Sequence, residues 1–374
     1  MLRLQHQQPL SRHLADRENA KILVRGRALV IQGDTEWTCD LYAQHFLTIW
    51  FDRTVFELSE NLIVIALGGN ALLQRGQKGT FEEQYQNVKK TAERVADLIV
   101  RGYRIVLTHG NGPQVGATLL RHEAAKGIVP TFPLDACGAE TQGFIGYMIQ
   151  QALRNELKSR GIDKFVVTVI TRVIVDKHDM AFQNPTKPIG PFYTKDEASR
   201  IRQQKPDLVI KEDAGRGFRR VVPSPDPKVI AERYAIRALI DAGFVVVACG
   251  GGGIPIIEQD GRAVGVEAVI DKDLGGQRLA TLIGANLFVI LTDVDGAYLN
   301  YGKSNQEYIR EITTGKLRNY ANEGQFKEGS MGPKVEAAIR FVESGGERAV
   351  IASLGSLIEA IDNKTGTQVT VPKA

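Results

Sequence analysis

The sequence of 374 residues predicts an α/β fold in which a mainly parallel sheet is covered by helices on both faces. Three observations support this prediction. From Leu62 onward, short apolar runs alternate with longer segments of helical periodicity. The first run, in LIVIALGGNALL at 62–73, has the composition of a buried strand. Glycine-rich turns follow several of the runs, at points where a strand would meet the next helix.

The first strand is expected to run into two glycines, an asparagine and a helix start. A helix over 80–102 is predicted next, because Thr80 and Glu83 form a capping box and Gly102 can end the helix. The elements expected after it are a strand over 103–107, a mostly helical segment over 135–161, a buried strand over 165–170, a helix over 228–243, a strand over 244–248, a helix over 274–283, a strand over 287–291, a helix over 333–344, a strand over 348–351, a short helix over 356–361 and a strand over 367–371. The residues expected on one apolar side of the segment 135–161 are Phe144, Ile145, Met148, Ala152, Leu153 and Leu157.

Two segments do not follow this alternation. Residues 1–61 contain both tryptophans and three of the six histidines, and the stretch 21–34 could form a hairpin. We expect residues 1–61 to be an extension of unknown role, disordered or produced by a wrongly assigned upstream start. Residues 176–220 are rich in proline and charge and too long for a simple crossover. We interpret them as a protruding subdomain, with a lid as one role; the alternative is a solvated surface excursion.

Composition excludes several classes of protein. Hydrophobic residues make up 43% and charged residues 24%, as in ordinary globular enzymes. A net charge of +4 is too small over this length to argue for nucleic acid, and no apolar run is long enough to cross a membrane. Cys39, Cys137 and Cys249 form no CxxC pair, which disfavours a zinc site or a disulfide framework. A reducing cytoplasm is the expected location.

Three glycine loops are the main candidates for anion binding. GGN at 68–70 and GNG at 110–112 each follow an apolar run, where backbone N–H groups and a helix N-terminus favour negative charge. Asn70 and Asn111 can add side-chain donors, or serve only as turn and cap residues. Four consecutive glycines at 250–253 indicate a need for bare backbone, most simply beside a nucleotide or a transferred phosphate; the alternative is a mobile turn.

Three lysines are candidate phosphate contacts. Lys334 follows SMGP, where Pro333 suits the first position of a helix, and a cation there is unfavourable unless an anion lies between. Lys272 is flanked by Asp271 and Asp273, and Lys187 lies in PTKP on the protruding segment. Any one of these lysines alone would be interpreted as a surface charge. Together with three glycine loops they predict a cage for phosphate oxygens.

Other motifs narrow the chemistry. In TDVDGAY, Asp293 and Asp295 could ligate magnesium or cap a turn. There is no GxxxxGK[ST] motif, so this is not a P-loop kinase, and no GxGxxG opens the first strand–helix turn, which disfavours a nicotinamide enzyme. His109 has no evident serine or cysteine nucleophile beside it, and we interpret it as structural or as a wall of the site.

From Leu62 to the C-terminus, the chain resembles carbamate kinases, which belong to the amino acid kinase family. The segments that carry the resemblance are ALGGNAL, THGNGPQVG, FQNPTKPIGPFY, ACGGGGIP, VIDKD, TDVDGAY and GSMGPK. FQNPTKPIGPFY is the part specific to this branch. The resemblance implies a three-layer αβα sandwich with about eight strands, and reversible phosphoryl transfer between ATP and carbamate, often run toward ATP in arginine catabolism. It also implies Mg²⁺ carried by the nucleotide and a homodimer, with no nucleic-acid or membrane partner.

The resemblance also implies roles for individual residues. It predicts a carbamate and phosphoryl lobe at 62–243 and a nucleotide lobe at 244–374. The catalytic set would be Lys187, Lys272, Asp273 and Lys334. The groups that hold carbamate and phosphoryl would be Gly68, Gly69, Asn70, Gly110, Asn111, Gly251 and Gly252. The nucleotide would lie near Thr292, Asp293, Val294, Tyr298, Met331, Gly332 and Lys334. Another small-acid kinase of this fold, such as an acetylglutamate or glutamate kinase, and a non-catalytic nucleotide-binding regulator remain alternatives.

Overall fold

The computed structural model describes residues 21–25, 28–32, 36–40, 61–74, 76–206, 208–213, 217–327 and 329–372. The chain separates into two compact units, Met1–Glu57 and Leu58–Ala374. In the first unit, β1 (Lys21–Arg25), β2 (Ala28–Gln32) and β3 (Glu36–Asp40) form an antiparallel sheet in that order. The hairpin expected within 21–34 is therefore confirmed, and the third strand was not predicted. The rest of the extension 1–61, apart from Asn61, lies outside the described residues.

The second unit is built on an eight-stranded, mainly parallel sheet, as predicted. Its strand order is β18-β20-β19-β15-β4-β5-β12-β6. The strands are β4 (Leu62–Leu67), β5 (Arg104–His109), β6 (Val166–Thr168), β12 (Val245–Val247), β15 (Leu287–Thr292), β18 (Glu311–Thr313), β19 (Arg348–Ser353) and β20 (Thr367–Thr370). Only the pair β19–β20 is antiparallel among these described strands. The parallel strands β15, β4, β5 and β12 therefore all end at the same edge of the sheet.

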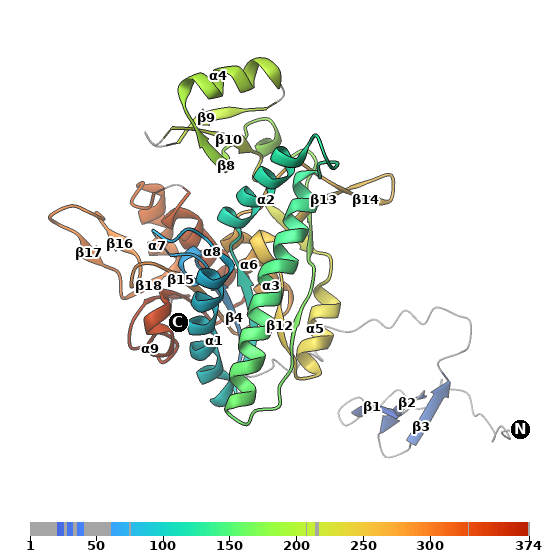
Figure 1. The fold of residues 1–374 in the computed structure, drawn as a ribbon. Coiled ribbons are helices and arrows are strands. Elements are labelled where there is room, and N and C mark those ends of the chain that lie inside the picture. The colour runs from blue at the N-terminus through green and yellow to red at the C-terminus, as the bar shows by residue number, and fades with distance from the viewer. Residues whose placement is uncertain are drawn as a thin grey trace, which may run out of the picture. The chain divides into compact units, whose positions relative to one another are not determined.

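Helices cover both faces of this sheet, which confirms the three-layer prediction (Figure 1). The helices on one face are α1 (Phe81–Val100), α3 (Leu134–Ser159) and α9 (Leu357–Ile361). Those on the other are α5 (Arg233–Asp241), α6 (Lys272–Leu282), α7 (Thr314–Asn322) and α8 (Met331–Glu343). Successive side chains of β4 enter opposite cores: Ile63 and Ile65 pack with α1 and α3, whereas Leu62 and Val64 pack with α6 and α8. The continuous apolar run of β4 follows from this burial on both faces.

Several helix ends agree with the sequence. The capping box of α1 is present, since the amide of Glu83 donates to Thr80 Oγ1 over 3.2 Å and the amide of Thr80 donates to the Glu83 carboxylate over 3.0 Å. The expected apolar side of α3 is wrong at Phe144, which is 38% exposed. The strand expected over 165–170 is shortened to β6 at the sheet edge, and its expected ends Phe165 and Ile170 are exposed.

Other boundaries differ for identifiable reasons. The segment 69–71 forms a short 3₁₀-helix (η3, Gly69–Ala71), so no α-helix starts directly after GGN. The beginning of the helix expected over 228–243 is instead β11 (Pro227–Ile230), which pairs with β7 (Arg172–Val175). This tertiary pairing overrides the local helical pattern. Pro333 is the third residue of α8, not the first. Elements without a predicted counterpart include β7, β18, α7, the hairpin of β13 (Ile254–Gln259) and β14 (Arg262–Gly265), and the small hairpin of β16 (Tyr298–Leu299) and β17 (Glu307–Tyr308).

The protruding subdomain lies beyond the end of the main sheet (Figure 1, top). It consists of β8 (Lys187–Tyr193), α4 (Lys195–Gln204), β9 (Ile210–Glu212) and β10 (Phe218–Val222), with the strands in the order β8-β10-β9. Strand β8 packs on α2 (Gly112–Ala125), the helix that follows β5. The first residue of β8 is Lys187, so this packing decides where that lysine lies. Within the described residues, no helix is both long and apolar enough to span a membrane.

Candidate active site

A cavity of about 230 Å³ opens at the edge of the sheet where β4, β5 and β12 end. The predicted site residues that line it are Gly69, Gly110, Asn111, Lys187, Gly251, Lys272, Asp273 and Lys334. All three predicted lysines and one residue or more from each glycine loop thus meet at one cavity. This convergence could not be derived from spacing, because Lys187 comes from the subdomain, Lys272 from α6 and Lys334 from α8.

Other predicted residues lie around this cavity and not in its wall. Gly68 is pressed against β15, where an added Cβ would lie 2.6 Å from the carbonyl oxygen of Leu291. An added Cβ on Gly252 would likewise lie only 2.5 Å from the carbonyl oxygen of Ile270. These two glycines are required by packing. Asn70 is exposed. The predicted nucleotide residues outside the wall are Thr292, Asp293, Val294, Tyr298, Met331 and Gly332. Their role stays a prediction; Thr292 ends β15, next to β4.

The wall also contains residues that were not predicted. Those with polar side chains are Gln114, Asp271 and Ser330, and Gly112 and Gly329 add further backbone. Asp271 is the most informative of them, because its carboxylate contacts Lys187. A signal for it was present in the sequence, since Asp271 flanks Lys272 on the side opposite Asp273. Gln114 had no comparable signal.

Asp273 is shared by two lysines. Its two carboxylate oxygens accept from Lys272 Nζ over 2.5 Å and from Lys334 Nζ over 2.9 Å, and its side chain is 3% exposed. Burial by itself would raise the pKa of Asp273, but the two ammonium groups prevail and lower it to about 2. Burial, partly offset by Asp273, lowers the pKa of Lys272, and the nearby charge of Lys334 adds to that effect. One carboxylate therefore holds two ammonium groups at fixed positions.

Asp271 holds the third lysine. Its Oδ2 accepts from Lys187 Nζ over 2.6 Å, while its Oδ1 accepts from the amide of Asp273 over 2.9 Å and so caps α6. Lys272 is consequently the first residue of α6, two residues earlier than the helix predicted from the sequence. The N-termini of both α6 and α2 therefore lie at the cavity wall, where their dipoles favour a bound anion.

The glycine loops lie close against these charged groups. An added Cβ on Gly110 would lie 3.1 Å from Cδ of Lys272, and one on Gly251 would lie 2.4 Å from the Asn111 amide. Gly251 also has φ +68°, a conformation that residues with side chains rarely adopt. Asn111 in turn donates to Thr141 Oγ1 over 2.8 Å, which fixes its amide. Bare backbone is thus needed here for close packing around the lysine and asparagine side chains.

Of the two interpretations of His109 from the sequence, structural or a wall of the site, the structure supports the structural one. Burial lowers its pKa to about 4, so the ring is neutral at pH 7. Nδ1 lies 2.9 Å from the carbonyl oxygen of Gly110, which can only accept, so Nδ1 carries the proton. Nε2 has no hydrogen-bond partner among the described residues and lies beneath Gly250, where an added Cβ would be 2.4 Å away. The ring therefore supports the four-glycine loop from below and does not line the cavity.

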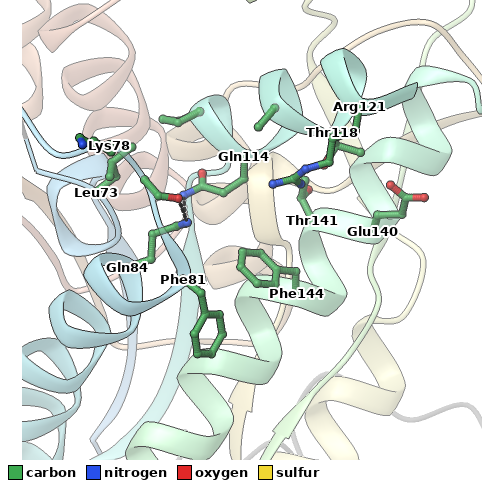
Figure 2. Close-up of a pocket in the computed structure, with 13 residues that line it drawn as sticks. Leu73, Lys78, Phe81, Gln84, Gln114, Thr118, Arg121, Glu140, Thr141 and Phe144 are labelled. Atoms are coloured by element: carbon green, nitrogen blue, oxygen red, sulfur yellow. Dashed lines mark hydrogen bonds between the residues drawn. The ribbon is translucent and has the colours of Figure 1, made fainter. Parts of the chain in front are cut away.

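A second cavity of about 440 Å³ adjoins the first, and the two share Pro113 and Gln114. Figure 2 shows Gln84 of α1 beside Gln114 of α2 in its wall. Gln114 Nε2 donates to Gln84 Oε1 over 2.7 Å, and Gln84 Nε2 donates to the carbonyl oxygen of Gly79 over 2.8 Å. These bonds tie the first turn of α2 to the start of α1, and so stiffen the helix N-terminus at the first cavity.

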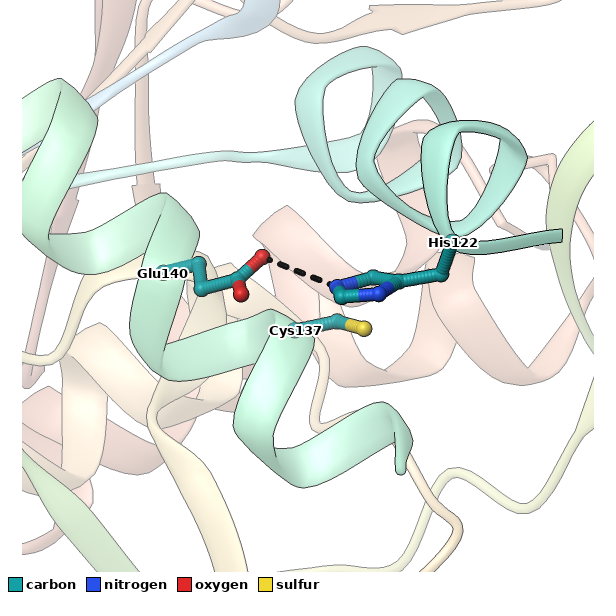
Figure 3. Close-up of side chains that lie close together, drawn as sticks. All are labelled: His122, Cys137 and Glu140. Atoms are coloured by element: carbon teal, nitrogen blue, oxygen red, sulfur yellow. Dashed lines mark hydrogen bonds and ion pairs between the residues drawn. The ribbon is translucent and has the colours of Figure 1, made fainter. Parts of the chain in front are cut away.

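Outside the wall of the first cavity, His122, Cys137 and Glu140 gather between α2 and α3 (Figure 3). His122 Nε2 lies 3.3 Å from a Glu140 oxygen, and the buried Cys137 thiol donates weakly to the carbonyl oxygen of Phe132 over 3.8 Å. Burial raises the pKa of that thiol to about 11. Because each of these side chains already has a partner, their proximity is explained by the packing of α2 against α3.

Comparison with known proteins agrees with the fold and with the sequence motifs. A family model described as the amino acid kinase family matches residues 61–353. The carbamate kinase of Pyrococcus furiosus is 58% identical over 309 residues, which are 82% of this chain and 98% of that protein. The carbamate kinase of Trichomonas vaginalis is 50% identical over 310 residues, again 82% of this chain and 98% of that protein. The structure of carbamate kinase from Giardia lamblia bound to AMP-PNP has a TM-score of 0.80 at 44% identity, covering 84% of this chain and 99% of that one.

These matches confirm the resemblance that the motifs predicted over most of the chain. The family model begins at residue 61, directly before β4, and the residues before it lie outside the family match. The chain belongs to the amino acid kinase family.

Proposed function

We propose that the protein is a carbamate kinase, which transfers a phosphoryl group reversibly between ATP and carbamate and gives ADP and carbamoyl phosphate. The observation that carries this proposal is the meeting of three lysines and three glycine loops at one cavity. Its relatives at 50% and 58% identity are carbamate kinases. The direction proposed is ATP formation during arginine catabolism, in the cytoplasm.

The chemistry requires positioning and charge neutralisation more than proton transfer. Carbamate is already an anion, so its attacking oxygen needs no general base. Lys187, Lys272 and Lys334 would neutralise charge on the migrating phosphoryl group, and Asp273 would keep two of them in place. In a preorganised site of this kind, loss of one donor costs on the order of 3 kcal/mol in barrier.

The binding roles are divided between the loops. Backbone N–H groups of Gly69 and Gly251, with the Asn111 side-chain amide, would hold carbamate and the phosphoryl group. Gly110, whose own N–H donates to the carbonyl oxygen of Leu67, would contribute by letting its loop pack against Lys272. Gly68, Asn70 and Gly252 would act beside them, the two glycines by allowing the loops to pack. The residues proposed to hold the nucleotide are Thr292, Asp293, Val294, Tyr298, Met331, Gly332 and Lys334. Most of the carbamate site would therefore come from residues 62–243, while residues 244–374 would hold the nucleotide and add Gly251 and Gly252 to the phosphoryl site.

The metal would enter with the nucleotide. Asp271 and Asp273 are the acidic side chains of the described cavity wall, and both are already paired with lysines. They therefore do not form an oxygen cage of the kind that holds a resident divalent ion. We propose Mg²⁺ bound to the phosphates of ATP or ADP, as part of the substrate.

We also propose a homodimer. Tyr147 on α3 and Phe165 and Ile170 beside the edge strand β6 are exposed and line one hollow of the surface, and Phe144 on α3 is exposed as well. Exposed large apolar side chains that gather at one place are typical of an interface. A second copy of the chain would cover it, and sedimentation or light scattering of a Tyr147→Glu variant would test this. A dimer that survives the charge at that position would contradict the proposed surface.

One coupled assay tests the proposed function. Purified protein supplied with ADP, Mg²⁺ and carbamoyl phosphate is expected to form ATP. Absence of ATP formation would reject the proposal. Phosphorylation of acetylglutamate or glutamate by ATP would instead indicate another small-acid kinase. Binding of nucleotide without phosphoryl transfer to any acid would favour the non-catalytic regulator. The FQNPTKPIGPFY segment, which contributes Lys187 to the cavity, favours the carbamate kinase.

A further inference from the structure

Asp271 makes two hydrogen bonds with different consequences. Oδ1 accepts from the amide of Asp273 and caps α6, and Oδ2 accepts from Lys187 Nζ. The Asp271 side chain is 12% exposed, whereas Lys187 is 32% exposed. A carboxylate that is mostly buried therefore fixes the position of a lysine that is otherwise the most exposed of the three at the cavity.

The two partners of Asp271 belong to different parts of the fold. Lys187 is the first residue of β8 in the protruding subdomain, and Asp273 lies in the first turn of α6 under the main sheet. Lys187 and Asp271 are 84 residues apart in the sequence. One side chain thus links the subdomain lysine directly to the helix that carries Lys272 and Asp273.

Asp271 also limits the positive charge of the cavity. With all five groups ionised, three lysines face two aspartates, so one net positive charge remains for the substrates. The Asp271 carboxylate competes with any phosphate oxygen for Lys187, and it repels a bound anion. Asp271 therefore weakens the binding of anionic substrates, so its contribution to the reaction must come from a step other than ground-state binding.

We propose that Asp271 is a positioning residue for phosphoryl transfer. It holds Lys187 at the position from which this lysine stabilises the transition state, and its negative charge weakens ground-state binding of the anionic substrates. This inference rests on the proposed carbamate kinase activity. It places Asp271 in a role separate from Asp273, which holds Lys272 and Lys334.

Replacement of Asp271 by asparagine separates its two hydrogen bonds. The amide of Asp273 requires an acceptor, so the carbonyl oxygen of the new side chain would keep the helix cap. The NH₂ group of that side chain would then face Lys187, and two donors cannot bond to each other. The Asp271→Asn variant is thus expected to keep α6 intact and to release Lys187. Asp271→Ala would lose the cap as well.

The experiment measures kcat and KM of wild type, Asp271→Asn, Lys187→Met and the double variant, with ADP and carbamoyl phosphate. For Asp271→Asn we expect kcat to fall about 30-fold, less than for removal of a donor itself because Lys187 is still present but no longer held. We expect KM for carbamoyl phosphate to fall roughly threefold because a repelling charge is gone. Inorganic phosphate, titrated calorimetrically, should bind more tightly in the same proportion. The double variant should have the kcat of Lys187→Met alone, since Asp271 acts through that lysine.

Glu267 provides a matched control. One of its oxygens accepts from the amide of Leu134, the first residue of α3, over 2.8 Å, and the other pairs with Arg220 of the subdomain over 2.7 Å. Glu267 therefore also joins a helix start to the subdomain, but it does not line the cavity. Glu267→Gln should leave kcat and KM within about twofold of wild type, as for a partly exposed ion pair.

The outcomes separate the inference from the function on which it rests. An inactive wild type rejects the carbamate kinase, whatever the variants do. With an active wild type, the inference is overturned if Asp271→Asn leaves kcat unchanged, raises KM, or adds its effect to that of Lys187→Met. Equal losses in Glu267→Gln and Asp271→Asn would also overturn it, because subdomain attachment alone would then explain both. Thermal unfolding of Asp271→Asn and Asp271→Ala shows whether the cap was kept.

Discussion

The charged cluster inside the sheet body and an ion pair between the body and the protruding subdomain differ in exposure. In the body, Asp273 is 3% exposed and shared by two lysines that are 18% and 14% exposed. Between the subdomain and the body, Lys205 is paired with Glu123 of α2, and these side chains are 38% and 58% exposed. The apolar contact between subdomain and body is also small, a cluster that contains Ile189 and Val222 beside residues of α2 and α3. Two lysines of the site are thus fixed by burial, and the third depends on how the subdomain is seated.

Removal of the shared carboxylate should have the largest effect on stability. Asp273→Ala leaves two ammonium groups close together without a counter-charge, and we expect the free energy of unfolding to fall by about 3–5 kcal/mol. Denaturant unfolding monitored by circular dichroism measures it. Glu336→Ala is the control. Glu336 pairs with Arg318 and Arg340 and its side chain is 33% exposed, so the substitution should lower the free energy of unfolding by no more than about 1 kcal/mol. Equal losses in the two variants would show that the Asp273 cluster is not energetically distinct.

Loss of one body lysine should affect turnover more than folding. Lys272→Ala is expected to lower kcat by roughly 100-fold to 1,000-fold, because a preorganised donor to the phosphoryl group is lost. Lys334 still pairs with Asp273 in this variant, so the structure should be retained. The coupled ATP assay measures the change, and Lys228→Ala, an exposed lysine of β11, serves as control. A Lys272→Ala enzyme with normal turnover would contradict the proposed role of the cluster.

The free energy of unfolding should depend on pH through the ionisation of Asp273. Asp273 has a pKa of about 2 in the folded protein against 3.8 ordinarily, so its contribution is present above pH 3.8 and is lost as the pH falls through 2. We expect the stability difference between wild type and Asp273→Asn to shrink by about 2 kcal/mol between about pH 5 and pH 2. Unfolding curves at several pH values measure this difference. A difference independent of pH would mean that Asp273 is not held ionised by its lysines.

The exposed pair between subdomain and body should have the smallest effect. Lys205→Ala or Glu123→Ala is expected to change the free energy of unfolding by less than about 1 kcal/mol and to leave kcat nearly unchanged, because solvent screens the pair. Glu123→Gln, which keeps the shape without the charge, is the matched control. A large loss of kcat in the Lys205 variant would instead show that this surface pair decides the seating of Lys187.

Much of the fold could be predicted because its signals are local. The capping box of α1, the apolar run of β4 and the glycine turns each depend on neighbouring residues, and the alternation of strands and helices implied a parallel sheet. Predictions failed where distant partners decide. The segment 227–230 became a strand by pairing with β7, and Phe144 is exposed although it fits the helical pattern. The hairpin after the four glycines gave no clear local signal either.

By itself, the sequence determined which residue types were available to the site: glycines after buried strands, and lysines beside aspartates and at a helix start. Only the tertiary structure decided how they pair. Lys334 and Asp273 are 61 residues apart, and Lys187 and Asp271 are 84 apart, so local spacing has no bearing on either contact. The adjacent parallel strands bring their loops to one edge, and the packing of β8 on α2 delivers the remaining lysine. Charge complementarity among mostly buried side chains then selects which carboxylate holds which ammonium group.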